Sequence, residues 1–301
     1  MLKKIIGNFQ TILTVINSNV KSSYRDIEYK NLGFKVYDEN ESKNIMIFIH
    51  GFGGNQDATY IKTFIDKLTS SNVNVLTFDA PGVGKSIKHK QFWGGGSGDQ
   101  GLLDDVIEWV IKQNKWDNIF VVGYSAGGGF LLSYLCGGGK IINKYKDKIT
   151  YSFFVSPTIK HNEMLRHAQK NNGFIYNSVV SVSHTIALVK HRFYHKKFLE
   201  IPHIIKNCTF NIIYANIYGS GNRKVLHKTN PPTQKINGLA IYTEDDPITP
   251  LHLMEEYRNY CDVKVLPFGG HVGFYNLDGS RENEKIILKK IKEIIEQDQE
   301  R

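Results

Sequence analysis

The sequence predicts an α/β protein built on a doubly wound, mostly parallel sheet, with a mainly helical cap inserted into it. Over the first 155 residues, short and continuously apolar segments alternate with amphipathic helical segments, as parallel strands buried on both faces require. Glycine-rich turns follow several of the expected strands. The alternation then stops for about 75 residues and resumes, which favours an insertion over a separate domain.

Composition and length set the class of protein. The chain has 301 residues, of which 41% are hydrophobic and 22% are charged, as in ordinary globular proteins. Cys136, Cys208 and Cys261 are too few and too scattered for a disulfide framework, and none has C-x-x-C spacing. We therefore expect no structural zinc and a reducing compartment. No apolar run reaches the roughly 18 residues that a membrane-spanning helix needs.

The first residues predict an amphipathic helix rather than a secretory signal. Apolar side chains recur at helical spacing, and no A-x-A cleavage site follows them. They are Ile5, Ile6, Phe9, Ile12, Leu13 and Ile16. We expect this helix to pack on the domain, and Lys3 and Lys4 leave a membrane-surface anchor as the alternative.

The predicted elements of the first part of the core, residues 1–155, follow in order. The strands are expected at 34–38, 44–49, 72–79, 118–122 and 149–155. The helices are expected at 57–69, 102–113 and from Ser125 to Leu135. Residues 236–301 form the second part of the core. It is expected to contain a strand at 237–243, a helix at 250–260, a strand at 262–266 and a helix at 284–295.

Between these parts, residues 156–235 are predicted to form a basic cap with helical pieces at 163–170 and 179–199. From 160 to 230 there are eleven Lys or Arg and two Glu, which equals the whole excess of +9, and seven of the 11 histidines. This charge favours an anionic substrate or an anionic lipid surface. His191 and His195 have the i, i+4 spacing of metal ligands. They lack an H-E-x-x-H motif and nearby carboxylates, so a solvated basic face is expected there.

The motif Gly123-Tyr124-Ser125-Ala126-Gly127 has the form G-x-S-x-G between an expected strand and an expected helix. Such a turn holds a serine hydroxyl exposed at the end of a strand, with small residues where side chains would collide. A serine needs a base to take its proton and a carboxylate to orient that base. Ser125 is therefore the candidate nucleophile.

The candidates for its partners lie at the ends of two later strands. Asp245 and Asp246 follow the expected strand at 237–243, and His271 follows the one at 262–266. The chain order serine, acid, histidine is that of α/β-hydrolases. His271 is the candidate base, and both aspartates are candidates for the acid.

An oxyanion hole needs two N–H groups aimed at the developing negative charge. We expect them from Ala126 and from Phe52, which lies in the glycine-rich turn 50–54. The tripeptide Gly84-Lys85-Ser86 resembles the end of a phosphate-binding loop. That motif needs a glycine where Asp79 stands, so nucleotide binding is not expected and Asp79 is expected to be structural.

Four stretches together resemble the α/β-hydrolase superfamily: 50–54, 78–86, 123–127, and 246–250 with the later Gly-Gly-His. Within it, Asp245-Asp246-Pro247 followed by the segment 269–274 is similar to the YheT-like esterase branch. The resemblance implies Asp246 as the acid. It also implies hydrolysis of carboxylic esters without a cofactor.

The sequence thus predicts a serine hydrolase that cleaves carboxylic esters or thioesters through an acyl-enzyme on Ser125, with acyl-lipid or anionic compounds as substrates. The alternatives are an acyltransferase using the same triad and a non-catalytic scaffold that binds a ligand or a membrane. We expect no cofactor, no metal and no nucleic-acid partner. The expected location is cytoplasmic, with peripheral attachment to an anionic membrane as a further expectation.

Overall fold

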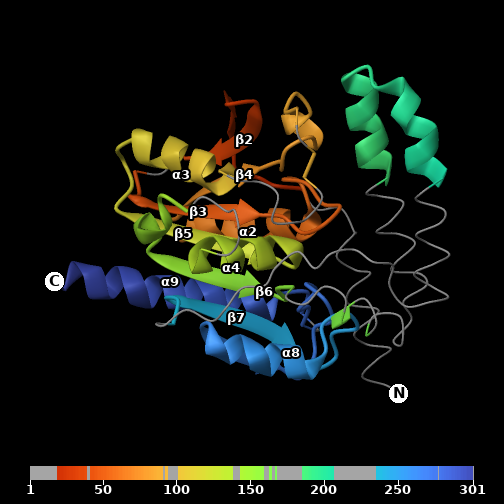
Figure 1. Cartoon of the computed structure of the whole chain (residues 1–301). Helices are drawn as coiled ribbons and strands as arrows, with labels where there is room; N and C mark the ends of the chain where they lie inside the picture. Colours follow the sequence, from red (N-terminus) through yellow and green to blue (C-terminus); the bar gives the residue numbers. More distant parts are fainter. Residues whose placement is uncertain are drawn as a thin grey trace.

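The computed structural model describes residues 19–38, 41–90, 92–93, 101–137, 143–158, 163–164, 167, 185–206, 235–276 and 278–300. Within these residues one sheet of eight strands forms the centre of the molecule, with helices on both faces (Figure 1). The strand order is β1-β2-β4-β3-β5-β6-β7-β8. β2 runs antiparallel to β1 and β4, and the remaining neighbours are parallel. This confirms the predicted fold class of a mostly parallel α/β sheet.

The strands are short and mostly buried. Their bounds are β1 Arg25–Tyr29, β2 Leu32–Tyr37, β3 Asn44–Ile49, β4 Asn74–Phe78, β5 Asn118–Tyr124, β6 Tyr151–Val155, β7 Gly238–Thr243 and β8 Asp262–Leu266. The five strands from β2 to β6 are almost wholly buried, which explains their continuous apolar sequences.

Helices cover the two faces and enclose two apolar clusters. The helices are α2 Thr59–Ser70, α3 Leu102–Lys112, α4 Ala126–Cys136, α8 Leu251–Glu256 and α9 Glu282–Gln299. α3, α4 and α8 pack on one face, where Leu103 and Phe130 belong to the same buried cluster. α2 and α9 pack on the other face, where Phe64 and Ile287 belong to the second cluster. The site must therefore lie at an edge of the sheet.

The structure differs from the predicted elements in two places. β1 was not predicted, because it is an edge strand of mostly exposed residues without a continuous apolar run. The helix expected over 250–260 ends as α8 at Glu256 and continues as a 3₁₀ turn, η4 Tyr257–Asn259. Other boundaries move by a few residues. β4, for example, begins at Asn74 because Asn72 adopts a left-handed φ of 62°.

The described part of the predicted cap is mainly a helical hairpin. Residues 185–194 and 201–206 are helical and are joined by a turn and the 3₁₀ turn η3 Phe198–Glu200. The expected helix at 5–16 and most of 156–235 lie outside the described residues, so the division into core and cap stays a prediction. Along the described chain, no helix has both the length and the apolar character needed to cross a bilayer.

Candidate active site

Ser125 lies at the sharp turn between β5 and α4. Its backbone has φ 50° and ψ −116°, a conformation that costs a non-glycine residue about 1–3 kcal/mol. Backbone hydrogen bonds hold it there: the N–H of Ser125 donates to the carbonyl of Val155 at 2.9 Å, and the N–H of Thr158 donates to the carbonyl of Ser125 at 3.1 Å. The neighbouring strand end thus fixes the serine on which the motif centres.

The two glycines of the motif allow backbone segments to pack closely around this turn. A Cβ atom on Gly123 would lie 2.6 Å from the carbonyl oxygen of Gly127. A Cβ atom on Gly127 would lie 2.5 Å from the carbonyl oxygen of Ile49, at the end of β3. Any side chain at either position would separate β3, β5 and α4.

The three predicted triad residues meet at the carboxyl edge of the sheet. Nε2 of His271 lies 2.8 Å from Oγ of Ser125, and Nδ1 of His271 lies 2.9 Å from Oδ2 of Asp246. A carboxylate only accepts hydrogen bonds, so Nδ1 carries the proton and Nε2 presents its lone pair to the serine hydroxyl. Both His271 and Asp246 are buried. The arrangement can remove a proton from Ser125 as its oxygen attacks an electrophile.

The two candidate acids have different positions. Asp246 contacts His271 and also accepts the N–H groups of Ile248 and Thr249 at 2.8 and 2.9 Å, which fix its carboxylate. Asp245 instead accepts the N–H of Gly270 at 2.9 Å. It therefore ties the end of β7 to the loop of the histidine. Of the two candidates, the structure brings Asp246 against the imidazole.

Arg281, which is only 1% exposed, donates hydrogen bonds to the loop that carries His271. Its Nε donates to the carbonyl of Gly273 at 2.6 Å, and Nη2 donates to the carbonyl of Val272. Nη1 donates to the carbonyl of Tyr60 on α2 at 3.1 Å. Since Val272 has a left-handed φ of 58°, these bonds hold a strained loop in place.

Glu284 balances the buried charge of Arg281 at 3.4 Å. It is fully buried and also binds Lys67 of α2 at 2.5 Å and the hydroxyl of Thr63 at 2.8 Å. α9, α2 and the histidine loop thus share one polar network. Arg281 was not predicted from the sequence, because an arginine at the start of a polar helix carries no signal of its own burial.

The glycine-rich turn after β3 lies directly against the serine. A Cβ atom on Gly51 would be 3.3 Å from Cβ of Ser125. The N–H of Gly51 donates to the hydroxyl of Tyr60 at 2.8 Å. Phe52 follows in this turn, half-buried, and Ala126 is the first residue of α4, where an N–H has no partner within the helix. Both expected oxyanion donors therefore belong to segments adjoining Ser125.

His50 orders the same turn. Its Nε2 accepts the N–H of Ala80 at 3.1 Å, so its Nδ1 carries the proton and donates to the carbonyl of Gly51 at 2.8 Å. Complete burial lowers the pKa of His50 below 6.5 and keeps the ring neutral. The ring also meets Trp93 edge-on, with centroids 5.3 Å apart. His50 thus joins the turn after β3 to the loop after β4.

Asp79 and Ser86 have structural contacts. Asp79 accepts the backbone and side-chain N–H groups of Gln56 at 2.8 and 2.9 Å and the N–H of Lys85 at 2.8 Å. The hydroxyl of Ser86 donates to the carbonyl of Asp79 at 2.6 Å. Gly84 is required here, because a Cβ atom would lie 2.2 Å from the carboxylate of Asp79. The N–H of Lys85 and the hydroxyl of Ser86, which would face the phosphate in a phosphate-binding loop, are thus bonded to Asp79.

His191 and His195 do not lie on the solvated face that the sequence predicted for them. His191 is fully buried, and its Nε2 donates to the carbonyl of His89 at 3.0 Å. Nε2 of His195 donates to the carbonyl of Ile87 at 3.0 Å. They dock the hairpin on the loop after β4. Among the described residues, no group of three His, Cys, Asp or Glu side chains is placed to hold a metal ion.

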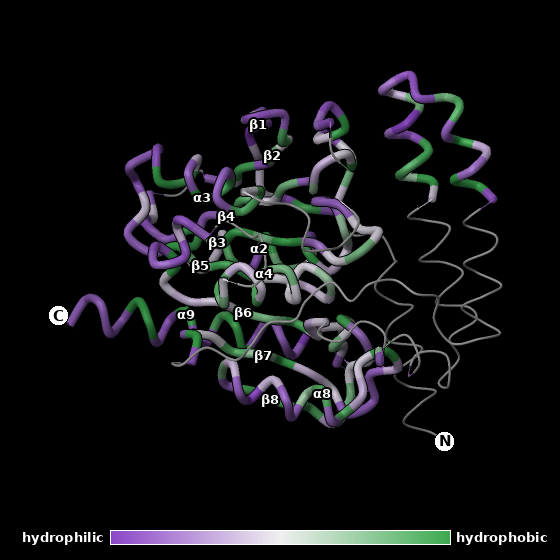
Figure 2. The backbone as a smooth tube through the Cα atoms, viewed as in Figure 1, coloured by the Kyte–Doolittle hydropathy of each residue, from purple (hydrophilic) through white to green (hydrophobic). Residues whose placement is uncertain are grey.

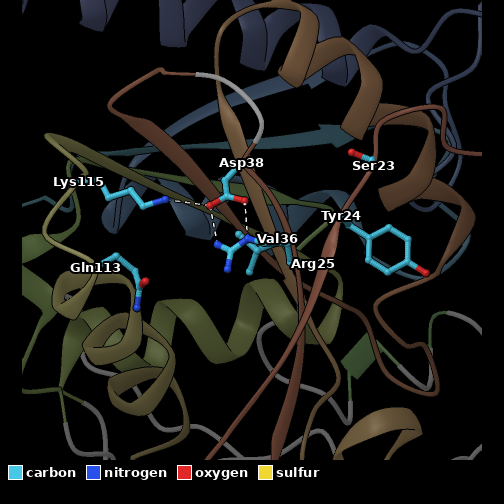
Figure 3. Close-up of a pocket in the computed structure, with 7 residues that line it drawn as sticks. All are labelled: Ser23, Tyr24, Arg25, Val36, Asp38, Gln113 and Lys115. Atoms are coloured by element: carbon cyan, nitrogen blue, oxygen red, sulfur yellow. Dashed lines mark hydrogen bonds and ion pairs between the residues drawn. The ribbon is translucent and has the colours of Figure 1, made fainter.

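A polar pocket lies at the opposite edge of the sheet (Figure 3). There the carboxylate of Asp38 accepts hydrogen bonds from Arg25 at 2.6 Å and from Lys115 at 3.0 Å. Burial alone would raise the pKa of Asp38, but these hydrogen bonds lower it below its ordinary value. Lys115 precedes β5, whereas Ser125 follows it, so this ion cluster is remote from the serine.

Comparisons with known proteins agree with the fold. A family model of the alpha/beta hydrolase fold matches residues 44–179. A putative monoglyceride lipase of Schizosaccharomyces pombe is 22% identical over 244 residues, or 77% of this chain. The chain spans 61% of the length of that relative.

Solved structures of esterases have the same fold. The Pyrococcus furiosus esterase Pf2001 superposes with a TM-score of 0.61 at 17% identity, covering 92% of this chain and 97% of the other. A soluble variant of monoglyceride lipase from Saccharomyces cerevisiae, in complex with a substrate analog, gives a TM-score of 0.54 at 16% identity, covering 94% and 99%. The chain has the α/β-hydrolase fold and is similar to esterases and monoglyceride lipases. The YheT-like branch stays a prediction.

Proposed function

We propose that this chain, which has the α/β-hydrolase fold, is a serine esterase that hydrolyses carboxylic esters or thioesters through an acyl-enzyme on Ser125. The observation that carries the proposal is the continuous contact from Ser125 through His271 to Asp246, at 2.8 and 2.9 Å. A serine held at a strained turn beside an imidazole that a carboxylate orients has the features of an activated nucleophile.

In the first step Oγ of Ser125 attacks the acyl carbon while Nε2 of His271 takes its proton. Asp246 stabilises the imidazolium that forms and keeps its ring oriented. The carbonyl oxygen becomes an oxyanion, which the N–H groups of Phe52 and Ala126 stabilise. Each such donor contributes about 10²–10³ in rate. His271 then gives its proton to the departing alkoxide or thiolate.

In the second step water attacks the acyl-enzyme, and His271 takes a proton from this water. The tetrahedral intermediate collapses, Oγ of Ser125 regains the proton and the carboxylic acid leaves. The net reaction consumes the ester and one water and releases the alcohol or thiol and the carboxylic acid, with no change of oxidation state. The relatives named as esterase and monoglyceride lipase support esters as the substrate class, and the basic cap segment supports acyl-lipid or anionic esters.

A cytoplasmic location, peripheral at a membrane, is the setting that we propose for this activity. Cys136 and Cys261 are free thiols, as in a reducing compartment. Burial raises their pKa values to about 11 and about 12, so neither is a competing nucleophile near neutral pH.

Labelling with a fluorophosphonate tests the proposal. We expect one adduct on Ser125, identified by peptide mass spectrometry, and none in Ser125→Ala. The matched control is Ser70→Ala, which removes an exposed hydroxyl at the end of α2 and should leave labelling unchanged. Equal labelling of wild type and Ser125→Ala would contradict the proposal. Products formed with added alcohol or thiol separate hydrolysis from acyl transfer.

A further inference from the structure

The described cap hairpin, residues 185–206, lies beyond the edge of the sheet at which β3 and β7 end (Figure 1). Ser125 follows β5 at this same edge. The turn between the two helical pieces is the outermost part of the hairpin, and nearly every residue from 193 to 200 is exposed. The hairpin is therefore a projection on the side of the molecule that carries the triad.

The hairpin holds most of the large apolar side chains that the described chain exposes. Of nine such side chains, six belong to it: Ile186, Phe193, Tyr194, Phe198, Leu199 and Ile205. Leu199 is 97% exposed, and Phe193 packs edge-on against Phe198 with ring centroids 5.1 Å apart. We call Phe193, Tyr194, Phe198 and Leu199 the apolar tip. Contiguous exposed apolar groups of this kind are typical of an interaction surface.

Basic side chains occur within and next to the apolar tip. The hairpin contains Lys190, Arg192, Lys196, Lys197 and Lys206 against a single acidic residue, Glu200. Glu200 binds Arg192 at 2.7 Å and so opposes only part of this charge. Figure 2 shows hydrophilic and hydrophobic residues alternating along the hairpin. Apolar and aromatic side chains with flanking lysines match the boundary between lipid headgroups and acyl chains.

Other occupants fit this surface less well. A second copy of the hairpin would bring the same positive charge against it, which is repulsive. Single-stranded nucleic acid binds through stacking on aromatic rings, whereas Leu199, Ile186 and Ile205 are aliphatic. In an anionic bilayer the headgroups attract the lysines and the acyl chains accommodate the aliphatic side chains.

The hairpin has fixed contacts with the core. His191 and His195 donate to the carbonyls of the loop after β4, and Phe92 of that loop lies 5.4 Å from the ring of His191. The next residue, Trp93, contacts His50. These contacts fix the hairpin beside the edge of the sheet that carries Ser125, and its tip points toward the side of the molecule on which β2 lies (Figure 1).

We propose that the apolar tip and its lysines form a docking element that attaches the protein to an anionic lipid bilayer. The inference rests on the proposed function and deepens it by naming the surface on which the enzyme works. Vesicle binding needs no turnover, so it is measured with the whole Ser125→Ala chain, and the failure of either proposal remains distinguishable.

The experiment is co-sedimentation with vesicles of pure phosphatidylcholine or with 30% phosphatidylserine. We expect binding to the anionic vesicles that weakens at 0.5 M salt. Lys196→Glu with Lys197→Glu should weaken it at least fivefold per lysine, and Phe193→Ser with Leu199→Ser should lower it at least tenfold. The matched controls are Leu251→Ser, an exposed leucine on α8, and Lys289→Glu with Lys292→Glu on α9, which should bind as the parent.

Three results would overturn the proposal. The parent chain could show no preference for anionic vesicles. The control variants could lose as much binding as the tip variants. Finally, the tip variants could change the mass of the protein in solution by light scattering while leaving vesicle binding intact, which would assign the surface to self-association.

Discussion

Two segments at the same edge of the sheet are built in opposite ways. The loops that carry Asp246 and His271 are buried, and hydrogen bonds hold their strained backbone. The hairpin at 185–206 is exposed at its tip and displays apolar side chains and lysines. The difference indicates that burial and hydrogen bonds fix the positions of Asp246 and His271, whereas they do not fix the side chains of the tip. The tip of the hairpin contributes little to the fold, and its exposed side chains are available for a partner.

The largest expected effect is on the triad acid. Asp246→Asn should lower kcat by about 10⁴, because an amide can hold the wrong tautomer of His271. Asp245→Asn should cost far less, since Asp245 accepts the N–H of Gly270 and it is Asp246 that contacts His271. Steady-state kinetics on a short-chain ester measures both. A larger loss from Asp245→Asn would reverse the assignment of the acid.

The next effect concerns Arg281. Arg281→Met should lower the free energy of unfolding by about 3–5 kcal/mol, as for other buried ion pairs that lose one partner. It should also lower kcat more than it raises KM, because the carbonyls of Val272 and Gly273 lose their donor and the loop of His271 shifts. Denaturant titration and kinetics measure the two effects. Arg258→Met, which removes an exposed guanidinium, is the control and should change neither.

A smaller effect is expected from His50. Its folded pKa is lowered, so its stabilising contribution is complete above pH 6.5 and is lost as the pH falls below 6.5, where the unfolded chain takes up the proton first. His50→Gln should therefore weaken the dependence of unfolding free energy on pH below 6.5. Denaturant titrations between pH 5.5 and 7.5 measure this. An unchanged slope would mean that His50 is not buried neutral.

The smallest effect should come from the hairpin. Leu199→Ala should change the free energy of unfolding by no more than about 0.5 kcal/mol, because the side chain is 97% exposed. Leu132→Ala, in the buried part of α4, should cost about 2–5 kcal/mol. Thermal or denaturant unfolding compares the two. Similar losses would erase the contrast between hairpin and core.

The sequence was informative where chemistry needs fixed residue types at fixed places. The strand-turn-helix around Ser125 and the strand ends at Asp246 and His271 follow from local patterns, so their proximity could be expected. The contacts of Arg281 could not, since they depend on carbonyls of two segments that only the fold brings together. His191 shows the same limit. Its helical spacing is equally compatible with a solvated face, and only the position of the loop after β4 decides its burial.

The span of the contacts made by Arg281 and His271 has a consequence for how the protein matures. His271 meets Ser125 across 146 residues of sequence, and Arg281 meets Tyr60 across 221. Such distant pairs form late during folding, because much chain must be ordered before they close. During synthesis the serine turn and strands β1 to β5 emerge first, while the later strands, the base and its anchor emerge afterwards. A ribosome-bound chain that already exposes Ser125 should therefore carry a chemically silent hydroxyl, and reactivity should begin only when α9 docks.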